Sequence, residues 1–363
     1  MRTFMFVFIG ITLFIIWFFL IVDNELSKPV VSLASIEQEE TFHQIRNNFD
    51  VQYVLESSPC STSHKIIIIV TCYVGHVELR SAHRRALSSE MLEQLGIKRV
   101  FLLASIPEYD KKFISQNAVK DESERYGDIV QGDFLEAYRN LTFKHVMGLS
   151  WAATRCSTAN FIIKVDDDIV FNIASIVEYL NKFIDVDVRS FLLGYVMKGM
   201  KPIRVLANKW FVTMSEYRKA FYPPFVSGWM YTTTPQTAEK LVSQAMTTPY
   251  FWIDDVYVTG ILASKIGIRL KDIKPDNIYL EYSELMDCCI ADMIKKNISC
   301  EYSVAPNGGD NNKFVKYVTA LDYCSVIDCT IRPNDKPLKK TCVAAKNLLP
   351  LEKGKPVVNV LKL

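Results

Sequence analysis

Residues 161–172 read Phe-Ile-Ile-Lys-Val-Asp-Asp-Asp-Ile-Val-Phe-Asn, and this stretch decides the fold class. Its apolar first half predicts a buried strand, which delivers Asp166, Asp167 and Asp168 together at its C-terminal end. Three adjacent carboxylates repel one another, and a divalent cation removes that repulsion. Hard cations such as Mg²⁺ and Mn²⁺ favour carboxylate oxygen and share their coordination shell with substrate phosphates. The triplet therefore predicts a site for a metal-bound nucleotide diphosphate, and a solvated acidic turn is the structural alternative.

The chain around this stretch alternates between strand-like and helix-like segments. We expect strands at residues 65–71, 99–104, 128–131 and 161–165, and helices at residues 78–95, about 108–126 and 135–154. Such alternation implies βαβ units and a mainly parallel sheet, whose ligands bind beyond the carboxyl ends of the strands. The sequence thus predicts an α/β fold with the Asp triplet at the binding edge.

The N-terminal part of the sequence holds an unbroken apolar stretch, residues 3–22. At about 1.5 Å per residue, roughly 20 residues span the hydrocarbon core of a bilayer. Arg2 precedes the stretch and acidic residues follow it, so the positive-inside rule places residues 1–2 in the cytoplasm and the later residues in the lumen. The N-glycosylation sequons at Asn140 and Asn297 agree with this orientation. We expect a signal anchor of a single-pass type II membrane protein.

The remaining sequence divides by composition. Residues 23–62 are polar without a sustained period and read as a lumenal stem, residues 63–285 as the catalytic domain, and residues 286–363 as a C-terminal extension of unassigned role. This extension holds six of the nine cysteines, which favours disulfides in a lumenal setting. A structural zinc site is disfavoured because no Cys-x-x-Cys pair occurs and no histidine follows His145. A net charge of +2 without a basic stripe argues against nucleic acid as a partner.

A second acidic pair, Asp254 and Asp255, follows the aromatic residues 250–252 and precedes a helical pattern over residues 256–266. The structural interpretation is helix capping, for which Asp is favoured. The functional interpretation is a general base, because a carboxylate beside apolar rings can have a raised pKa. We expect one carboxylate to cap the helix and the other to face a cleft.

Between the two acidic sites lies an aromatic segment, residues 209–231, interrupted by the rigid pair Pro223 and Pro224. Aromatic side chains beside polar ones suit sugar rings, which have apolar faces and hydroxyl edges. Ordinary core packing accounts for most of these rings. Trp229 is the residue that we single out as lining a pocket.

Five segments in this order resemble the β1,3-glycosyltransferases of the animal Golgi, glycosyltransferase family 31, which contains the β1,3-galactosyltransferase group. The segments are residues 80–84, 126–142, 164–172, 222–228 and 254–257. Their sequences are similar to the family patterns R.AIR, GDI…DF…Y.NLT, K.DDD.F.N, YPPY.SG and [E/D]DVY. Each segment alone is a weak signal, but five in order behind an expected anchor are specific.

The resemblance implies a GT-A fold and an inverting transfer of a hexose, by default galactose, from a UDP-sugar to an acceptor 3-hydroxyl on a glycoprotein or glycolipid. It implies Mn²⁺ or another divalent cation at Asp168, with Asp166 at the ribose or the metal, and Asp255 as the catalytic base. By the same resemblance, the nucleotide-sugar would contact Arg80, Arg84, Lys164, Asp166 and Asp167, and the acceptor or sugar pocket would contain Ser227, Gly228, Trp229 and Asp254. The Golgi membrane is the implied location.

Three positions depart from the family pattern. Leu87 replaces a tryptophan, Trp229 and Met230 replace a glycine-rich stretch, and no histidine follows His145 to complete a metal shell. These departures keep an alternative open, in which the protein is a catalytically silent family member that acts as a chaperone or binding partner of another Golgi glycosyltransferase. A calcium-binding loop of the EF-hand type fits poorly. In an EF-hand the acidic residues alternate and are accompanied by a glycine and a distal glutamate, whereas here the three aspartates are consecutive and no such glycine follows.

Overall fold

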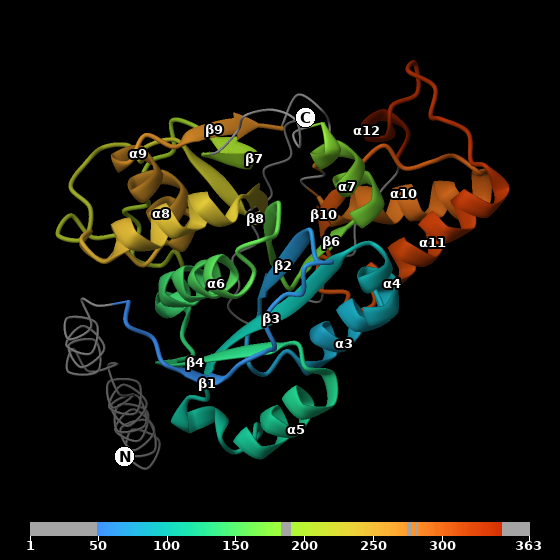
Figure 1. The fold of residues 1–363 in the computed structure, drawn as a ribbon. Helices are drawn as coiled ribbons and strands as arrows, with labels where there is room; N and C mark the ends of the chain where they lie inside the picture. Colours follow the sequence, from blue (N-terminus) through green and yellow to red (C-terminus); the bar gives the residue numbers. More distant parts are fainter. Residues whose placement is uncertain (1–48, 183–189, 274–277, 280–281, 343–363) are drawn as a thin grey trace, which may run out of the picture. The chain divides into compact units, whose positions relative to one another are not determined.

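The computed structural model describes residues 49–182, 190–273, 278–279 and 282–342. Eight of the described strands form one sheet in the order β1-β4-β3-β2-β5-β8-β7-β9, and two more pair beside it as β10-β6 (Figure 1). Their bounds are β1 Tyr53–Leu55, β2 Ile66–Thr71, β3 Ile97–Ser105, β4 Ile129–Leu135, β5 Phe161–Asp166, β6 Ile169–Phe171, β7 Phe191–Met197, β8 Phe225–Thr233, β9 Arg269–Asp272 and β10 Val304–Pro306.

The central strands are parallel, as the alternating pattern predicted. β4, β3, β2 and β5 run in one direction, and β7 is parallel to β9, whereas β1, β8 and β10 pair antiparallel with their neighbours. From β2 the chain adds β3 and β4 on one side and then crosses to place β5 on the other. The carboxyl ends of β2 and β5 therefore flank a topological switch point, where open α/β sheets bind their ligands.

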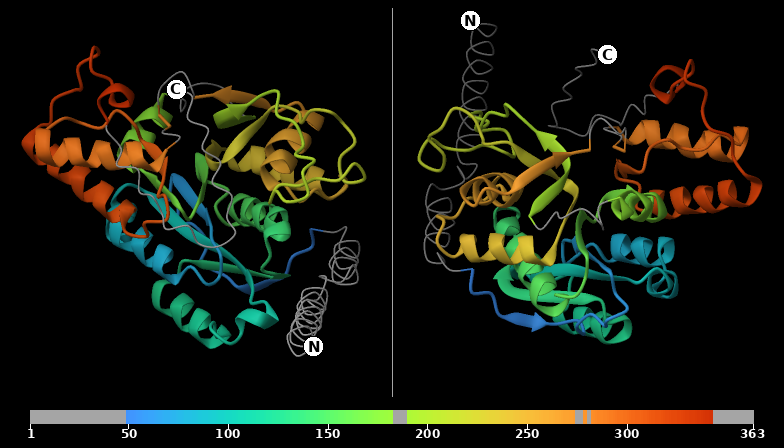
Figure 2. Two further views of the ribbon diagram at one scale, coloured as in Figure 1. Left: turned by 180° about the vertical axis from the view of Figure 1, so that it is seen from behind. Right: turned by 45° about the horizontal axis from the view of Figure 1, so that its top comes forward.

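Helices cover both faces of this sheet (Figures 1 and 2). One face packs against α3, α4, α5, α7, α10 and α11, and the other against α6, α8 and the π-helix η3. The bounds of the helices are α3 Val77–Ala86, α4 Ser89–Gln94, η1 Glu108–Asp110, α5 Gln116–Tyr126, η2 Tyr138–Asn140, α6 Leu141–Arg155, α7 Ile173–Asn181, α8 Pro235–Ala245, η3 Val256–Leu262, α9 Ala263–Lys265, α10 Ser283–Lys296, α11 Lys313–Ile327 and α12 Leu338–Thr341.

Strand β2 shows why this arrangement forms. All six of its residues are buried: Ile66, Ile68 and Val70 enter one hydrophobic cluster, and Ile67 and Ile69 enter the other. Successive side chains of a strand point to opposite faces, so a continuous apolar run is stable only where helices cover both.

All three predicted helices differ from the observed ones; the one expected over about residues 108–126 is divided into η1 and α5, which begins only at Gln116. The helix expected over residues 78–95 is divided into α3 and α4, because Ser88 caps α4 by accepting a hydrogen bond from the Met91 amide. The helix expected over residues 135–154 begins only at Leu141, since β4 continues to Leu135 and η2 follows it.

The stem prediction for residues 23–62 is wrong for its described part. Strand β1 is the edge strand and pairs with β4, and Cys60 forms a disulfide with Cys156 at the end of α6. Residues 49–62 therefore belong to the folded unit, and their polar composition reflects an edge strand and an exposed approach to it.

The boundary predicted at residue 285 is also wrong, because it falls inside α10. β10 pairs with β6 directly after the Asp triplet, and α11 contributes Phe314, Tyr317 and Ala320 to the first hydrophobic cluster. Figure 2 shows α10 and α11, in orange and red, side by side at one side of the fold. The C-terminal cysteines form three disulfides, as the sequence favoured: Cys288–Cys342, Cys289–Cys300 and Cys324–Cys329.

Across the part of the chain that the structure describes, no helix combines the length and apolar character that a bilayer crossing requires. The predicted anchor, residues 3–22, lies outside the described residues.

Candidate active site

A cavity of about 490 Å³ opens at the switch point, beyond the carboxyl ends of β2 and β5. It brings both predicted acidic groups to one space, although 86 residues separate the two in sequence (254 less 168). Its walls come from the loops after β2, β4 and β5, from the aromatic segment and from the start of the helix that continues as η3. The acidic residues that line it are Glu136, Asp166, Asp167, Asp168, Asp254 and Asp255.

The Asp triplet is held at the strand end by backbone contacts on both sides. The Asp167 amide donates to the Thr71 carbonyl at 3.1 Å, and the Asn307 amide donates to the Asp168 carbonyl at 2.8 Å. The His83 ring meets the Asp167 carbonyl at 2.9 Å. Segments from before and after the triplet therefore fix how its side chains enter the cavity.

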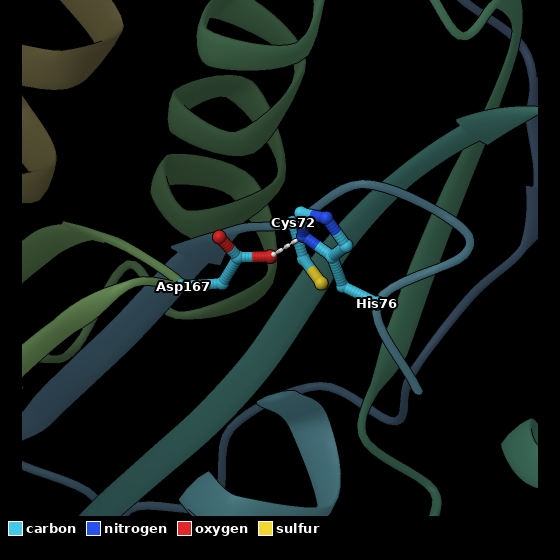
Figure 3. Close-up of side chains that lie close together, drawn as sticks. All are labelled: Cys72, His76 and Asp167. Carbon is cyan, nitrogen blue, oxygen red and sulfur yellow. Dashed lines mark hydrogen bonds and ion pairs between the residues drawn. The ribbon is translucent and has the colours of Figure 1, made fainter. Parts of the chain in front are cut away.

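Each carboxylate of the triplet has a different environment. Asp166 accepts a hydrogen bond from Lys164 Nζ at 2.6 Å, yet desolvation raises its pKa well above the usual range despite that cation. Asp167 lies 2.8 Å from His76 Nδ1, and hydrogen bonds with His76 and Cys72 hold its pKa low against desolvation (Figure 3). Desolvation and the charge of Asp167 raise the pKa of Asp168.

This set of groups fits a hard divalent cation. Within the described ranges, no lysine or arginine makes an ion pair with Asp168, and burial together with the charge of Asp167 raises its pKa. Carboxylate oxygens are the ligands that Mg²⁺ and Mn²⁺ prefer. Asp168 is accordingly the carboxylate best placed to bind a cation, with Asp166 beside it.

A hydroxyl that the sequence did not single out also fits a ligand. Thr71, the last residue of β2, lines the cavity, and its Oγ1 is buried without a hydrogen-bond partner among the described residues. Buried polar atoms are normally satisfied, so an unpaired hydroxyl in a cavity wall indicates that a ligand or water supplies the partner.

The second acidic pair lies at the start of the helix that leads into η3. Asp255 Oδ2 accepts a hydrogen bond from the Gly228 amide at 2.8 Å, and Asp255 makes no capping hydrogen bond. Burial, followed by the charge of Asp254, raises the pKa of Asp255 to about 7, while Lys164 and the Gly228 amide act in the opposite direction. A carboxylate with such a pKa is suited to general-base catalysis near neutral pH.

Asp254 has a partner of its own. Its Oδ2 lies 2.9 Å from His145 Nδ1, and the other ring nitrogen of His145 lies 2.7 Å from the Tyr231 hydroxyl. His145 is fully buried, and burial lowers its pKa, so the ring is neutral and donates from Nδ1 while Tyr231 donates to Nε2. The hydrogen bond from His145 keeps the pKa of Asp254 low in spite of burial.

A buried ion pair forms another part of the cavity wall. Lys144 Nζ donates to Glu136 Oε1 at 2.5 Å and to the Cys72 carbonyl at 2.6 Å. The second oxygen of Glu136 accepts from the amides of Val74 and Ala104. Lys144, Glu136 and His145 were not predicted from the sequence as site residues. Charged and polar residues on the buried face of α6, an otherwise apolar helix face, are the signal that could have revealed Lys144 and His145.

Aromatic rings line the part of the cavity towards the second acidic pair. Trp210 Nε1 donates to the Tyr138 hydroxyl at 2.7 Å, and Lys209 lies over both rings. Tyr138 and Trp210 are 48% and 43% exposed, which leaves their ring faces open to a ligand. Trp252 and the predicted Trp229 line the same cavity.

With this geometry described, comparison with known proteins identifies the group to which the chain is related. The sequence profile of the family described as "Galactosyltransferase" matches residues 78–274, more than half of the chain. The chain belongs to this galactosyltransferase family. It is therefore an enzyme of the galactosyltransferase class, and the expected resemblance is confirmed.

Named relatives agree with this assignment. The chain is 29% identical to human beta-1,3-galactosyltransferase 5, over 72% of this chain and 78% of that protein. It is 30% identical to mouse beta-1,3-galactosyltransferase 1, over 67% and 75%. It is 32% identical to human beta-1,3-galactosyltransferase 2, over 64% of this chain but only 55% of that protein. Among solved structures, the WbbM bifunctional glycosyltransferase matches 75% of this chain and 52% of its own, with a TM-score of 0.38 and 8% identity.

The arginines predicted at the nucleotide of this galactosyltransferase lie elsewhere. Arg80 is fully buried, pairs with Glu122 at 2.7 Å and donates to the carbonyls of Tyr73 and Val74. Arg84 pairs with Glu122 and Asp128, and neither arginine lines the cavity. Their direct role at the nucleotide is therefore wrong, because acidic partners from neighbouring elements already occupy both guanidinium groups. Arg80 instead supports the loop after β2.

Three other predicted site residues lie outside the cavity lining. Lys164 is fully buried, and its ammonium group joins Asp166 to the Gly228 carbonyl, 2.7 Å away. Gly228 provides the amide for Asp255, and Ser227 precedes it on β8. None of the three is among the residues that line the cavity. Lys164 and Gly228 instead contact two of its carboxylates, Asp166 and Asp255.

The two predicted glycosylation sites differ. Asn140 is 7% exposed, and its amide nitrogen donates to the Leu135 carbonyl at 2.8 Å, so the fold disfavours a glycan there. The sequon is packed at the junction of η2 and α6. Asn297 is exposed at the end of α10, and its glycosylation stays a prediction.

Proposed function

We propose that the protein is an inverting β1,3-galactosyltransferase that moves galactose from UDP-galactose to the 3-hydroxyl of a glycan on a glycoprotein or glycolipid. The observation that carries this proposal is the single cavity that the Asp166–Asp168 carboxylates and the Asp254–Asp255 pair share. A donor held at one group would present its sugar to a base in the other. The named relatives support β1,3-transfer and galactose as the donor sugar.

Asp168 and Asp166 would hold Mn²⁺ or another divalent cation. When bound, this cation would neutralise the diphosphate and favour the departure of UDP. Thr71 would meet the donor with its unpaired hydroxyl. Lys164, buried between the two acidic groups, offsets the charge of Asp166 and so keeps both groups compatible with one small cavity.

Asp255 would be the catalytic base. As the acceptor oxygen attacks C1 of the sugar, its proton would pass to Asp255, and the C1–O bond to UDP would break with the electron pair leaving on UDP. Attack from the side opposite UDP inverts the configuration at C1. Asp254 is less suited to the proton transfer, because its Oδ2 already accepts a hydrogen bond from His145 and its pKa is held low.

The aromatic residues near this base would receive the acceptor. Tyr138 and Trp210 offer exposed ring surface for the apolar side of a sugar, and Lys209 beside them adds a donor. The expected single-pass anchor at residues 3–22 and a Golgi location complete the proposal; their basis is the sequence alone.

The test is donor-dependent release of UDP by the purified full-length protein. UDP-galactose, UDP-N-acetylglucosamine, UDP-N-acetylgalactosamine and UDP-glucose would each be offered with a pool of β-glycoside acceptors, in Mn²⁺ and in EDTA. We expect release from UDP-galactose alone, dependent on acceptor and metal. Asp168→Ala should lose metal dependence together with activity.

Asp255→Asn separates binding from chemistry, because it keeps the shape of the side chain and removes the proton acceptor. It should bind UDP as the wild-type protein does and lose transfer, whereas Asp254→Asn should retain part of it. Unchanged turnover in Asp255→Asn would place the base elsewhere. Metal-dependent UDP binding without transfer from any donor would instead fit the alternative of a silent family member.

A further inference from the structure

A cysteine, a histidine and an aspartate converge in the wall of the cavity, beside the carboxylates already assigned (Figure 3). Cys72 directly follows β2, His76 precedes α3, and Asp167 follows β5. One ligand atom from each of the three lies within 4.8 Å of the other two. Asp167 is 91 residues from His76, so the pairing of β2 with β5 is what assembles the group.

We propose that Cys72, His76 and Asp167 form a second metal site, which prefers Zn²⁺ over Mn²⁺. Thiolate, imidazole and carboxylate are the three ligand types that zinc takes in proteins, whereas Mn²⁺ favours oxygen ligands. Three protein ligands at a cavity wall leave a fourth position open to water or substrate. This site is distinct from the oxygen-only group of Asp166 and Asp168.

The positions of the side chains allow the site to close around a cation. His76 Nδ1 and Asp167 Oδ2 are 2.8 Å apart in a hydrogen bond, and ligand atoms of a tetrahedral zinc are separated by roughly 3.3 Å. The imidazole lies on a loop with its side chain 47% exposed, so it can move by this small distance without disturbing the core. Cys72 is buried and provides the fixed side of the site.

Two polar groups lie beside the sulfur of Cys72: the Arg80 guanidinium and the Tyr73 carbonyl, to which Sγ donates at 3.3 Å. Arg80 Nη1 lies 3.5 Å from Cys72 Sγ, and the charge of this guanidinium is in turn offset by Glu122. Zinc would replace the thiol proton, which leaves to solvent, and Arg80 would help to stabilise the thiolate.

Zinc at this position would draw Asp167 towards it and occupy the wall of the cavity next to Asp168. It should therefore compete with binding of the donor. This consequence rests on the proposed function, whereas the metal binding itself does not.

Co²⁺ titration of the full-length protein tests the binding directly. Cobalt substitutes for zinc, and its bond to a thiolate gives a charge-transfer absorption in the near ultraviolet. The other eight of the nine cysteines are in disulfides, so Cys72 is the single thiol that can produce this band. We expect the band to appear, to be displaced by Zn²⁺, and to resist an equal concentration of Mn²⁺.

Variants assign the ligands. Cys72→Ser should abolish the band, and His76→Gln should weaken cobalt binding at least about tenfold, in line with the loss of a metal contact. His64→Gln is the matched control, because His64 pairs with Glu93 away from the cavity and should bind cobalt as the wild type does. His76→Gln keeps the test valid if Cys72→Ser fails to fold, since His76 is half-exposed.

Absence of a thiolate band, or equal cobalt affinity in wild type and His76→Gln, would overturn the proposal. Displacement by Mn²⁺ as readily as by Zn²⁺ would overturn the preference. In a transfer assay, zinc should inhibit the wild type at concentrations at least tenfold below those that inhibit His76→Gln. A protein that binds cobalt through Cys72 but transfers no sugar would contradict the proposed function and leave the metal site standing.

Discussion

The amide of Gly228 donates a hydrogen bond to Asp255 at 2.8 Å, and a methyl group on Gly228 would lie 2.0 Å from the other oxygen of that carboxylate. The glycine thus serves two purposes: it orients the carboxylate and leaves the space that the carboxylate occupies. This explains a glycine within β8, where it contributes no side chain to the core.

Gly228→Ala should therefore displace Asp255. We expect transfer to fall at least about a hundredfold, the scale of losing one well-positioned catalytic group, with UDP affinity within about twofold of wild type. Steady-state kinetics and UDP titration measure the two quantities. Both substitutions remove the same function, that of the Asp255 carboxylate. The double variant Gly228→Ala with Asp255→Asn should therefore have the same transfer rate as Asp255→Asn alone. Additive losses would show that Gly228 acts on something else.

The raised pKa of Asp255 has opposite effects on activity and on stability. As a base it must be ionised, so log(kcat/KM) should rise with pH and level off above about 7. Its native pKa lies above its unfolded value, so the native state binds more protons and this carboxylate costs stability as pH rises from about 4 to about 7. Asp255→Asn should melt a few degrees higher than wild type at pH 8 and close to wild type at pH 4.

Differential scanning calorimetry across that range measures the effect on stability. An equal difference in Tm at pH 4 and pH 8 would mean that the charge of Asp255 is not the cause.

His145 links Asp254 to Tyr231 in the protein interior. His145→Phe would remove a partner from the Asp254 carboxylate, which is 15% exposed, and from the fully buried Tyr231 hydroxyl; an unsatisfied buried group costs about 1–3 kcal/mol. Tyr231→Phe removes one hydrogen bond and leaves the contact between His145 and Asp254 in place. Urea denaturation should accordingly show a larger loss for His145→Phe than for Tyr231→Phe. The reverse order would contradict the hydrogen-bond directions assigned to His145.

The two sequons differ in exposure, which predicts one glycan rather than two. In cells that glycosylate secretory proteins, Asn297→Gln should reduce the mass by one N-glycan, and Asn140→Gln should leave the glycan mass unchanged. Mass spectrometry of the intact protein before and after glycosidase treatment measures both. A glycan on Asn140 would require the junction of η2 and α6 to rearrange.

The strands that form because of their own apolar residues could be predicted from the sequence. The apolar run of β2 and the strand before Asp166 were found because continuous burial has a direct signature in sequence. The division between α3 and α4 was missed because Leu87 continues the apolar helical period. Ser88 nevertheless starts a new helix there, since its side chain caps α4. Arg80 and Arg84 were misplaced because a motif shows that guanidinium groups occur on a helix. It does not show that Glu122 of α5 and Asp128, which precedes β4, pair with them.

Contacts between distant segments account for the remaining differences. The role of Gly228 depends on which side of β8 faces Asp255, and the involvement of Cys72 and His76 depends on the pairing of β2 with β5. Residues 49–62 and the segment after residue 285 looked separable because the alternating strand and helix pattern weakens in both, yet a disulfide and a strand pair join them to the core.

The pairing of β10 with β6 has a consequence for how the protein is made. The ribosome releases the Asp triplet well before Val304–Pro306, so a nascent chain holds its three carboxylates without the strand that borders them. We expect the cavity to acquire its final form only after the last cysteine-linked helices have been synthesised. A truncated chain that ends after residue 274 would thus contain the region that the family profile matches but would lack β10, and we expect it to be inactive. Activity therefore depends on synthesis of the chain through β10 and the helices that follow it.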